Sequence, residues 1–499
     1  MLSFLNPLLI RTFRNLFALL VFLPVSSYCQ TIEKVVFDSN DSTDGYYLAI
    51  LPHSNQIRGT LVLFNSFSTP ERMLPETKLH NVAYVNDLLT IAVSMKQKLY
   101  ADTVTVERLN TILKHVVSKY AADTSKFVLA GYDFAGNIAL RYTEFTREYP
   151  AQFLIHPRAV IAIDSPVDLF GLWNWSERQI KRNSVSAGDA KYILDLMTKE
   201  NGTLHNRKEQ YDKLTPFDNE KAITGNEVFL KNIPVRLYYD ADIEWHLKNR
   251  RNSLYDTNIP NGTELISRLL DLGNKEAELI TAKKPGMNSR GIRTTNSLSI
   301  VDEVECIHWI KNKLDIFDPH TWIPPYNLPT PKGWEVERFP IPIEFAPQIN
   351  YKGVEDVRFS PGWADEKSEE YWSYIYLWWL EGEQKMDAST LGKNLKAYYE
   401  GLVKGNITRR NIPAGKIIPT SVFIKNVKTE PDDLGTYNGT IGMLDYMTQK
   451  PIMLNCIVHV RTCKTENRTV VLIEISPRPF SHPIWKEINR IKERFECKN

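Results

Sequence analysis

Several features that would point to a common class of protein are missing from this sequence. Its 499 residues carry 61 Lys and Arg against 59 Asp and Glu, a formal net charge of +2, and no basic tract with interleaved aromatic residues. Binding to nucleic acid therefore has no electrostatic support. The ten histidines are scattered and form no HExxH or HxH pattern. We accordingly expect no metal site and no cofactor.

Long hydrophobic runs are also missing beyond the first thirty residues. Near the N-terminus, Arg11 and Arg14 precede the apolar residues 16–25 (LFALLVFLPV), a run shorter than the ~20 residues that a helix needs to cross a bilayer. This is the layout of a secretory signal peptide, and Ser27 and Cys29 favour cleavage after residue 29. We predict an exported protein (periplasmic, surface-bound or secreted) with no membrane span after cleavage. An uncleaved anchor and a lipoprotein are the alternatives.

Cysteine is scarce, with five residues in the whole chain and no CxxC pair. Four cysteines lie beyond the predicted signal peptide. Their spacing excludes a zinc site with closely spaced ligands. Cys463 and Cys497 both belong to the C-terminal part and can pair in an oxidising compartment. Cys456 stands in an apolar run (IMLNCIV) and is predicted to be a packed thiol.

The N-terminal part shows the pattern of an α/β domain. From residue 59 to residue 317, short apolar runs alternate with helical stretches, which is typical of βαβ units and a parallel sheet. The clearest helical spacing covers residues 104–120. A charged and aromatic insertion at residues 168–227 is predicted to form a lid. The predicted strands are residues 60–64, 89–93, 127–130, 159–163, 235–239 and 277–281.

A proline-rich stretch separates this part from a second domain. Residues 319–347 contain eight prolines, and since proline fixes φ and removes a backbone donor, we predict an extended connector between domains at 30–318 and 348–499. The second domain is expected to be α+β with an antiparallel sheet. Its predicted helices are residues 368–380, 391–402 and 483–495, and its predicted strands are residues 420–428, 439–447, 452–463 and 469–476.

Aromatic residues crowd the first of these segments (SEEYWSYIYLWWL). Such a cluster is either a platform that stacks on sugar rings or the buried stripe of a helix, and the spacing of Tyr371, Tyr374, Ile375 and Trp378 favours the buried stripe.

The most informative segment is residues 127–141, FVLAGYDFAGNIALR. A buried strand enters a tight turn bounded by small residues and continues directly into an amphipathic helix, as in the Gly-x-Ser-x-Gly nucleophile elbow. Gly131 and Gly136 stand near the two glycine positions, and Asp133 takes the place of the nucleophile. On these residues the N-terminal domain resembles the α/β-hydrolase superfamily. The resemblance implies a mostly parallel sheet with a lid insertion, and it leaves the C-terminal domain unassigned.

The resemblance also implies where the partners of the nucleophile should lie. The orienting acid should follow the strand after the lid, where Asp242 is the better match and Asp240 the second choice. The catalytic histidine should follow the next strand, but no histidine occurs between His246 and His308. Asn296 occupies the expected histidine position. His246 is a candidate substitute base.

Asp133 allows two interpretations. Haloalkane dehalogenases and epoxide hydrolases of this fold use an aspartate followed by an aromatic residue, which Asp133 and Phe134 resemble. A carboxylate attacks carbon directly, but hydrolysis of the resulting ester needs a base. Alternatively, Asp133 only caps the following helix in a degenerate elbow. The backbone N–H groups of Ser66 and Phe134 are the candidate oxyanion hole.

Two functions are therefore expected. The first is an exported hydrolase-like protein with an altered or lost triad, which carries out ester-type or aspartate-nucleophile hydrolysis through Asp133 and Asp242. The second is a pseudoenzyme: a non-catalytic cell-envelope protein that binds a small molecule, a glycan or a protein partner.

Overall fold

The protein is described from a computed structural model, which covers residues 30–38, 45–54, 56–319 and 322–498. The predicted signal peptide at residues 1–29 lies outside these ranges. The chain divides into two compact units, Met1–Ile316 and Phe317–Asn499. Each unit is described by itself. None of the helices in the described ranges is long and apolar enough to cross a membrane.

The first unit is built on an eight-stranded sheet with the order β1-β2-β4-β3-β5-β6-β7-β8. Strand β2 pairs antiparallel with β1 and β4, and the other pairs are parallel. The six predicted strands are all present, and β1 and β2 precede them. The bounds are β1 (Ile32–Val36), β2 (Tyr46–Ile50), β3 (Gly59–Asn65), β4 (Leu88–Ser94), β5 (Phe127–Tyr132), β6 (Ala159–Ile163), β7 (Val235–Tyr239) and β8 (Ala277–Thr281).

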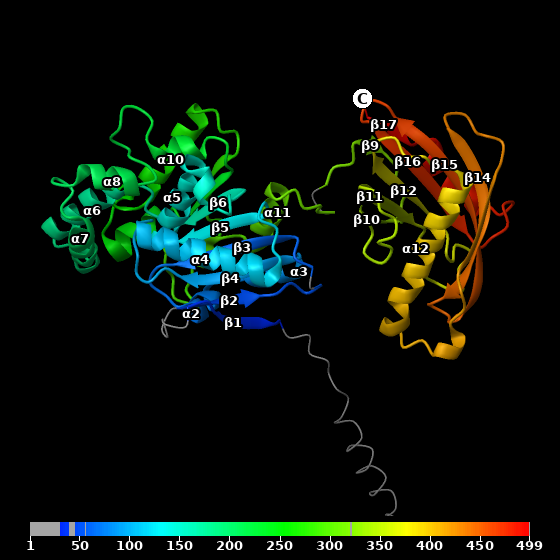
Figure 1. The fold of residues 1–499 in the computed structure, drawn as a ribbon, viewed down its shortest axis with the longest axis horizontal. Helices are drawn as coiled ribbons and strands as arrows, with labels where there is room; N and C mark the ends of the chain where they lie inside the picture. Colours follow the sequence, from blue (N-terminus) through cyan, green and yellow to red (C-terminus); the bar gives the residue numbers. More distant parts are fainter. Residues whose placement is uncertain (1–29, 39–44, 55, 320–321, 499) are drawn as a thin grey trace, which may run out of the picture. The chain divides into compact units, whose positions relative to one another are not determined.

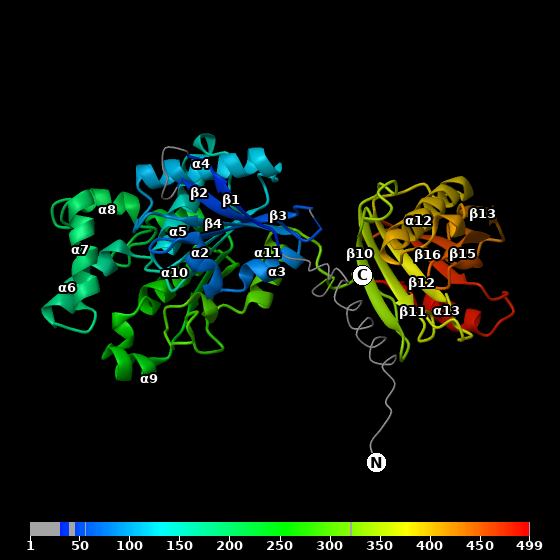
Figure 2. The same ribbon diagram turned by 90° about the horizontal axis from the view of Figure 1, so that it is seen from below.

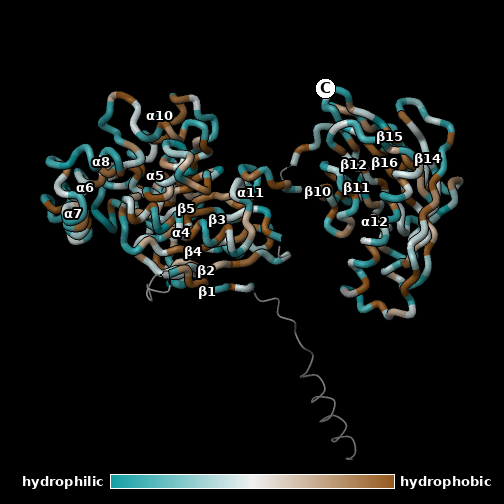
Figure 3. The backbone as a smooth tube through the Cα atoms, viewed as in Figure 1, coloured by the Kyte–Doolittle hydropathy of each residue, from teal (hydrophilic) through white to brown (hydrophobic). Residues whose placement is uncertain are grey.

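Helices cover both faces of this sheet, as its hydrophobic strands require (Figures 2 and 3). One face packs against α4 (Thr103–Tyr120), α5 (Phe134–Glu148) and α10 (Ile259–Asp271). The other face packs against α3 (Leu79–Val85) and α11 (Glu303–Lys313). The mostly parallel α/β architecture is thus confirmed. The short helices α2 (Pro70–Met73) and α9 (Ile243–Trp245) lie in connections.

The insertion after β6 is helical. It contains α6 (Leu169–Lys181), α7 (Ala187–Asn201) and α8 (Lys208–Leu214), which lie together at one end of the first unit (Figure 1). Their apolar residues form a separate small core that includes Phe134, the first residue of α5. The insertion therefore reaches the turn between β5 and α5.

The second unit contains a seven-stranded sheet with the order β10-β11-β12-β16-β15-β14-β13, antiparallel throughout. Helix α12 (Ala388–Arg409) covers one face and α13 (Ile484–Glu493) covers the other. This confirms the predicted α+β class. The strands are β10 (Glu335–Ile341), β11 (Gly353–Phe359), β12 (Tyr374–Glu381), β13 (Ser421–Asn426), β14 (Gly435–Asp445), β15 (Lys450–Cys463) and β16 (Arg468–Ser476), with β9 (Tyr326–Asn327) and β17 (Glu496–Cys497) paired separately.

Two predictions for this part of the chain are wrong. Residues 374–381 form strand β12, not a helix, and seven of its eight residues are buried because the sheet is covered on both sides. A strand buried on both faces has no alternation, so its spacing resembles that of a helix. The proline-rich residues 319–347 are not a separate connector, because they belong to the second unit and supply β9 and the edge strand β10. Proline is tolerated at such an edge.

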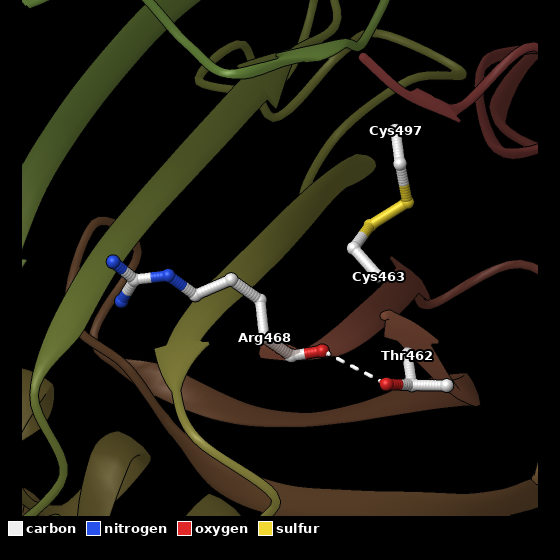
Figure 4. Close-up of a disulfide and its surroundings, with 4 residues drawn as sticks. All are labelled: Thr462, Cys463, Arg468 and Cys497. Atoms are coloured by element: carbon white, nitrogen blue, oxygen red, sulfur yellow. Dashed lines mark hydrogen bonds between the residues drawn. A yellow bond between two sulfur atoms is a disulfide. The ribbon is translucent and has the colours of Figure 1, made fainter. Parts of the chain in front are cut away.

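The structure confirms that Cys463 pairs with Cys497 and that Cys456 is a packed thiol. Cys463 at the end of β15 and Cys497 in β17 form a disulfide that closes a separation of 34 residues (Figure 4). Cys306 and Cys456 are buried free thiols.

Candidate functional site

The turn between β5 and α5 has the strained geometry of an elbow. Asp133 has φ 55° and ψ −133°, a region that a residue with a side chain rarely adopts. The neighbouring glycines make the close approach of strand and helix possible. A Cβ on Gly131 would collide with the backbone of Ala135, and one on Gly136 would collide with Ser165. Such strain persists in proteins mainly where function needs it.

The Asp133 side chain does not cap its helix. No side-chain capping hydrogen bond to α5 is formed, and the contact of the carboxyl with the start of the helix is to the backbone N–H of Phe134, the residue next to it. Instead Asp133 lines a cavity of about 750 Å³. Burial raises the pKa of its carboxyl to about 7, although the backbone N–H of Phe134 and the side-chain amide of Asn296 both lower it. Near neutral pH the Asp133 carboxyl is therefore charged in some molecules and neutral in the others.

Asn296 lies beside Asp133, where the resemblance requires the catalytic histidine. Its amide interacts with the Asp133 carboxyl and it lines the same cavity. Its Oδ1 atom is buried and has no hydrogen-bond partner within the described ranges. An amide cannot take up a proton, so Asn296 orients the carboxyl but cannot act as its base.

Both acids predicted after β7 are held by one arginine. Arg293 Nη1 lies 2.7 Å from Asp240 Oδ2, and Arg293 Nη2 lies 2.9 Å from Asp242 Oδ2. Asp242 also accepts a hydrogen bond from the Trp245 backbone N–H at 2.9 Å. Neither acid is among the residues that line the cavity. Both acids act on the cavity through His246, a lining residue whose pKa their charges raise.

His246 follows α9 and lines the cavity. Burial lowers its pKa, while the charge of Asp240 and, more weakly, that of Asp242 act in the opposite direction. The positive charges of Arg250 and Arg293 also lower this pKa, so the neutral ring is favoured and the two carboxylates act against that preference. Its Nδ1 atom has no hydrogen-bond partner among the described residues. These are properties of a general base.

A second carboxyl, which the sequence reasoning missed, stands next to Asp133. Asp164 directly follows β6, has φ 46° and lines the cavity. Burial raises its pKa well above the ordinary value, and the charge of Asp133 raises it further. Both causes favour the neutral form of Asp164, which is the form that can donate a proton. Its position at the carboxyl end of a central parallel strand was the available signal.

The candidate oxyanion hole is present in part. Phe134 lines the cavity, and its backbone N–H hydrogen-bonds the Asp133 carboxyl. Ser66 is buried and is not a lining residue, whereas its neighbour Phe67 is. The Phe67 N–H donates to Asn65 Oδ1 at 2.8 Å, and its ring packs edge-on against Phe134 at 5.5 Å.

The remaining wall of the cavity mixes apolar residues, among them Leu172, Trp175 and Ile193, with polar ones that include the carboxyl of Asp189. Arg178 and Arg250 contribute two positive charges, and Asp256 lies 3.0 Å from Arg178. Burial raises the pKa of Asp168 to about 7, so this carboxyl is also partly neutral. Amides and exposed aromatic rings complete the lining: Asn174, Asn219, Asn252, Asn258, Asn261, Tyr192 and Tyr255.

The first unit now presents an eight-stranded, mostly parallel sheet covered on both faces, with a strained elbow between its fifth strand and the following helix. This is the α/β-hydrolase fold. Asp133 and Asn296, expected from the sequence at the nucleophile and histidine positions, both line the cavity, whereas the expected acids Asp240 and Asp242 do not.

Comparisons with known proteins give matches to solved structures alone. No family model and no curated protein matches the sequence. Among solved structures, the chain is similar to the esterase domain of a Rhodothermus marinus protein, with 13% identity over 56% of this chain and 99% of that chain and a TM-score of 0.35. It is also similar to an acylaminoacyl peptidase from Pyrococcus horikoshii, with 14% identity over 61% of this chain and a TM-score of 0.38.

The match with the acylaminoacyl peptidase covers only 44% of the length of that protein. A fungal esterase from Rhizomucor miehei is similar at 13% identity, over 63% of this chain and 92% of the esterase, with a TM-score of 0.38. Similarity at this level does not transfer substrate or mechanism, which must be argued from the site itself.

Proposed function

We propose that the α/β-hydrolase domain hydrolyses an uncharged substrate by means of Asp133 as a carboxylate nucleophile. The observation that carries the proposal is the state of Asp133: it sits in a strained elbow, makes no side-chain capping hydrogen bond and lines a large cavity. The mixed apolar and polar lining favours an uncharged substrate. The substrate class that best fits the two neighbouring carboxyls is an epoxide, whose leaving group is an oxygen that needs a proton.

In the first step, an Asp133 carboxylate oxygen attacks an epoxide carbon. The C–O bond of the ring breaks with its electron pair on oxygen, and that oxygen takes the proton of Asp164. Asp164 suits this role because burial and the charge of Asp133 keep its pKa well above the ordinary value. The products are an ester between Asp133 and the substrate, a new hydroxyl group on the substrate, and an Asp164 carboxylate.

In the second step, His246 takes a proton from water as the water oxygen attacks the ester carbonyl of Asp133. The N–H of Phe134, which already bonds this carboxyl, stabilises the oxyanion. Collapse expels the substrate oxygen, which receives the proton from the His246 imidazolium. The proton left on Asp133 passes to the neighbouring Asp164 carboxylate, and both carboxyls return to their starting states.

We also propose that the protein is exported. The signal-peptide pattern and the disulfide between Cys463 and Cys497 both support an exported protein, because disulfides persist in oxidising compartments.

The test is the intact mass of the protein after incubation with a panel of styrene oxide, an activated ester and a haloalkane. The proposal predicts a covalent adduct of the epoxide, or turnover to the diol, in the parent protein and neither in Asp133→Ala. The matched control is Asp189→Ala, which removes another carboxyl of the cavity. Equal adducts in parent and Asp133→Ala, or no reaction in folded parent protein, would contradict the proposal.

The second candidate function is non-catalytic binding of a small molecule or glycan in the same cavity. Asn296 favours it, because an amide at the base position removes the usual route for ester hydrolysis. Under this alternative, none of the reactive probes gives an adduct, while neutral sugars bind the parent protein reversibly.

A further inference from the structure

The second unit contains a cavity of its own, of about 290 Å³, on the side of the sheet that α13 covers. Asn438 of β14, Ile457 of β15 and Glu474 of β16 contribute its floor. These three residues are direct partners in the strand register, so their side chains share one face of the sheet. Phe480 and Trp485 contribute an aromatic wall, with ring centroids 4.8 Å apart.

Two buried acceptor atoms meet in this cavity. Glu474 is 1% exposed, and neither its Oε1 atom nor Oδ1 of Asn438 has a hydrogen-bond partner within the described ranges. Buried polar atoms are nearly always bonded, and a pair without partners in one cavity is therefore unusual. Both atoms accept hydrogen bonds, so the complementary ligand must be a donor.

In the described ranges Glu474 forms no ion pair with a lysine or arginine, although Lys486 lines the same cavity together with Asn489 and the charge of Lys492 acts on Glu474. Asp433 is held by Arg461 at 2.7 Å, and Glu430 is held by Lys492 at 2.6 Å. In the part of the chain that the structure describes, no lysine or arginine lies within 4.0 Å of Glu474.

Its nearest ionisable neighbour is His459, with Nε2 at 3.7 Å from Glu474 Oε1. The other ring nitrogen of His459 is 2.7 Å from Asp433 Oδ2, which orients the ring. The His459 Nε2 atom has no hydrogen-bond partner among the described residues and adds a third polar atom next to Glu474.

The aromatic wall presents ring surface. The indole N–H of Trp485 already donates to the backbone oxygen of Arg478 at 3.0 Å, so this residue has no polar atom left to offer the cavity. The faces of tryptophan and phenylalanine rings attract cations.

We propose that this cavity binds a small organic cation that carries a primary ammonium group. An ammonium has three N–H donors and no acceptor, which matches the oxygens of Glu474 and Asn438 and supplies the missing positive charge. Its alkyl part would lie against Phe480 and Trp485. A metal ion fits less well: ligand atoms of Glu430, Asp433 and His459 lie within 4.8 Å of one another, but arginine and lysine already hold the two carboxylates. The inference is independent of the hydrolase proposal.

The experiment is a calorimetric titration of the full chain with n-butylammonium chloride at pH 8.5. We expect saturable binding that weakens at least tenfold in Glu474→Gln, a substitution that keeps the shape and removes the charge. The matched control, Glu487→Gln, removes an exposed carboxylate of α13 that pairs with Arg490 and should leave the affinity unchanged. Asn438→Asp, which adds a carboxylate beside Glu474, should tighten binding.

The pH dependence gives an independent readout. Burial raises the pKa of Glu474 to about 8, with Lys492 and Arg461 lowering it and Glu430 and Glu493 raising it. Since the cation needs the charged form, its apparent affinity should rise about tenfold per pH unit below 8 and level off above. The other ionisable groups near Glu474 are His459, with Nε2 at 3.7 Å, and Lys486, which lines the cavity. In Glu474→Gln the rise should be largely lost.

Three results would overturn the proposal. One is the absence of n-butylammonium binding to folded protein at pH 8.5. Another is equal affinity in the parent protein and in Glu474→Gln of unchanged melting temperature. The third is binding of 1-butanol or methyl α-glucoside as tight as that of the ammonium and equally dependent on Glu474, which would make the ligand a neutral alcohol or sugar.

Discussion

At the scale of residues, the sequence predicts those site residues whose positions follow from the order of strands and helices. It does not predict those that only folding brings to the site. Asp133 and Asn296 were found because the elbow and the loop after β8 have fixed places in the order of elements. Asp164 was missed because its importance comes from sharing a cavity with Asp133, whose charge raises its pKa, although the two residues follow different strands. Arg293 was missed because nothing in its sequence context shows that it pairs with both Asp240 and Asp242.

The first residue-scale prediction concerns pH. The Asp133 carboxyl, with a pKa of about 7, attacks only in its charged form, so the rate of adduct formation should rise about tenfold from pH 5 to pH 6 and level off above pH 8. Stopped-time mass spectrometry with an epoxide measures it. A flat profile from pH 5 to pH 8 would contradict the assignment.

The same raised pKa predicts a change in stability. The folded protein favours the neutral form of the Asp133 carboxyl. The contribution of this carboxyl to the free energy of unfolding is therefore complete below the unfolded pKa of 3.8 and is lost as the pH rises towards 7. Asp133→Asn, which cannot ionise, should therefore be more stable than the parent at pH 8, by up to about 4 kcal/mol, with little difference near pH 4. Urea unfolding at both pH values measures this difference, and a variant less stable at pH 8 would refute the burial argument.

Asn296 offers the next prediction at this scale. Asn296→His places an ionisable ring beside Asp133, and general-base help is worth roughly 10²–10⁴-fold, so breakdown of the aspartyl ester should accelerate by about that factor. Single-turnover decay of the adduct measures it. Asn296→Gln keeps an amide and should show no acceleration.

At the scale of elements, the buried parallel strands were predicted well because they are continuous apolar runs bounded by polar turns. Strand β12 was mistaken for a helix because both of its faces are covered, by α12 and by α13, which removes the alternation that marks a strand. Strand β10 was missed because it contains Pro340 and stands in a proline-rich stretch, although proline is tolerated at the edge of a sheet.

The elbow yields the prediction at this scale. Gly131→Ala should destabilise the first unit by about 3 kcal/mol or more, because the added Cβ collides with backbone atoms of Ala135 that cannot move independently of α5. The matched control is Gly188→Ala in α7, where an added Cβ meets nothing within 4 Å and should be neutral or stabilising by about 0.5–1 kcal/mol. Thermal unfolding compares the two. Equal effects would contradict the account of the elbow.

At the scale of the whole molecule, the sequence predicted two domains of the right classes but drew the boundary between them incorrectly. A stretch with eight prolines looks like a linker by composition, whereas its backbone hydrogen bonds belong to the second sheet. Composition describes the flexibility of a segment in isolation and not the partner that it finds in the folded chain.

The disulfide gives a prediction for the molecule as a whole. Loss of the link between Cys463 and Cys497, which closes a separation of 34 residues, should lower the stability of the second unit by about 4 kcal/mol and leave the first unit unchanged. The double variant Cys463→Ser and Cys497→Ser, followed by calorimetry, measures both transitions. An equal loss in both units would contradict the division of the chain.

The most direct test of the central claim is hydrolysis of an epoxide in water labelled with ¹⁸O, followed by mass analysis of the peptide that contains Asp133. If Asp133 is the nucleophile, the oxygen of the first product comes from its side chain and the label enters the Asp133 carboxyl. If water attacks the substrate directly, the label appears in the diol and the peptide keeps its original mass, which would contradict the account.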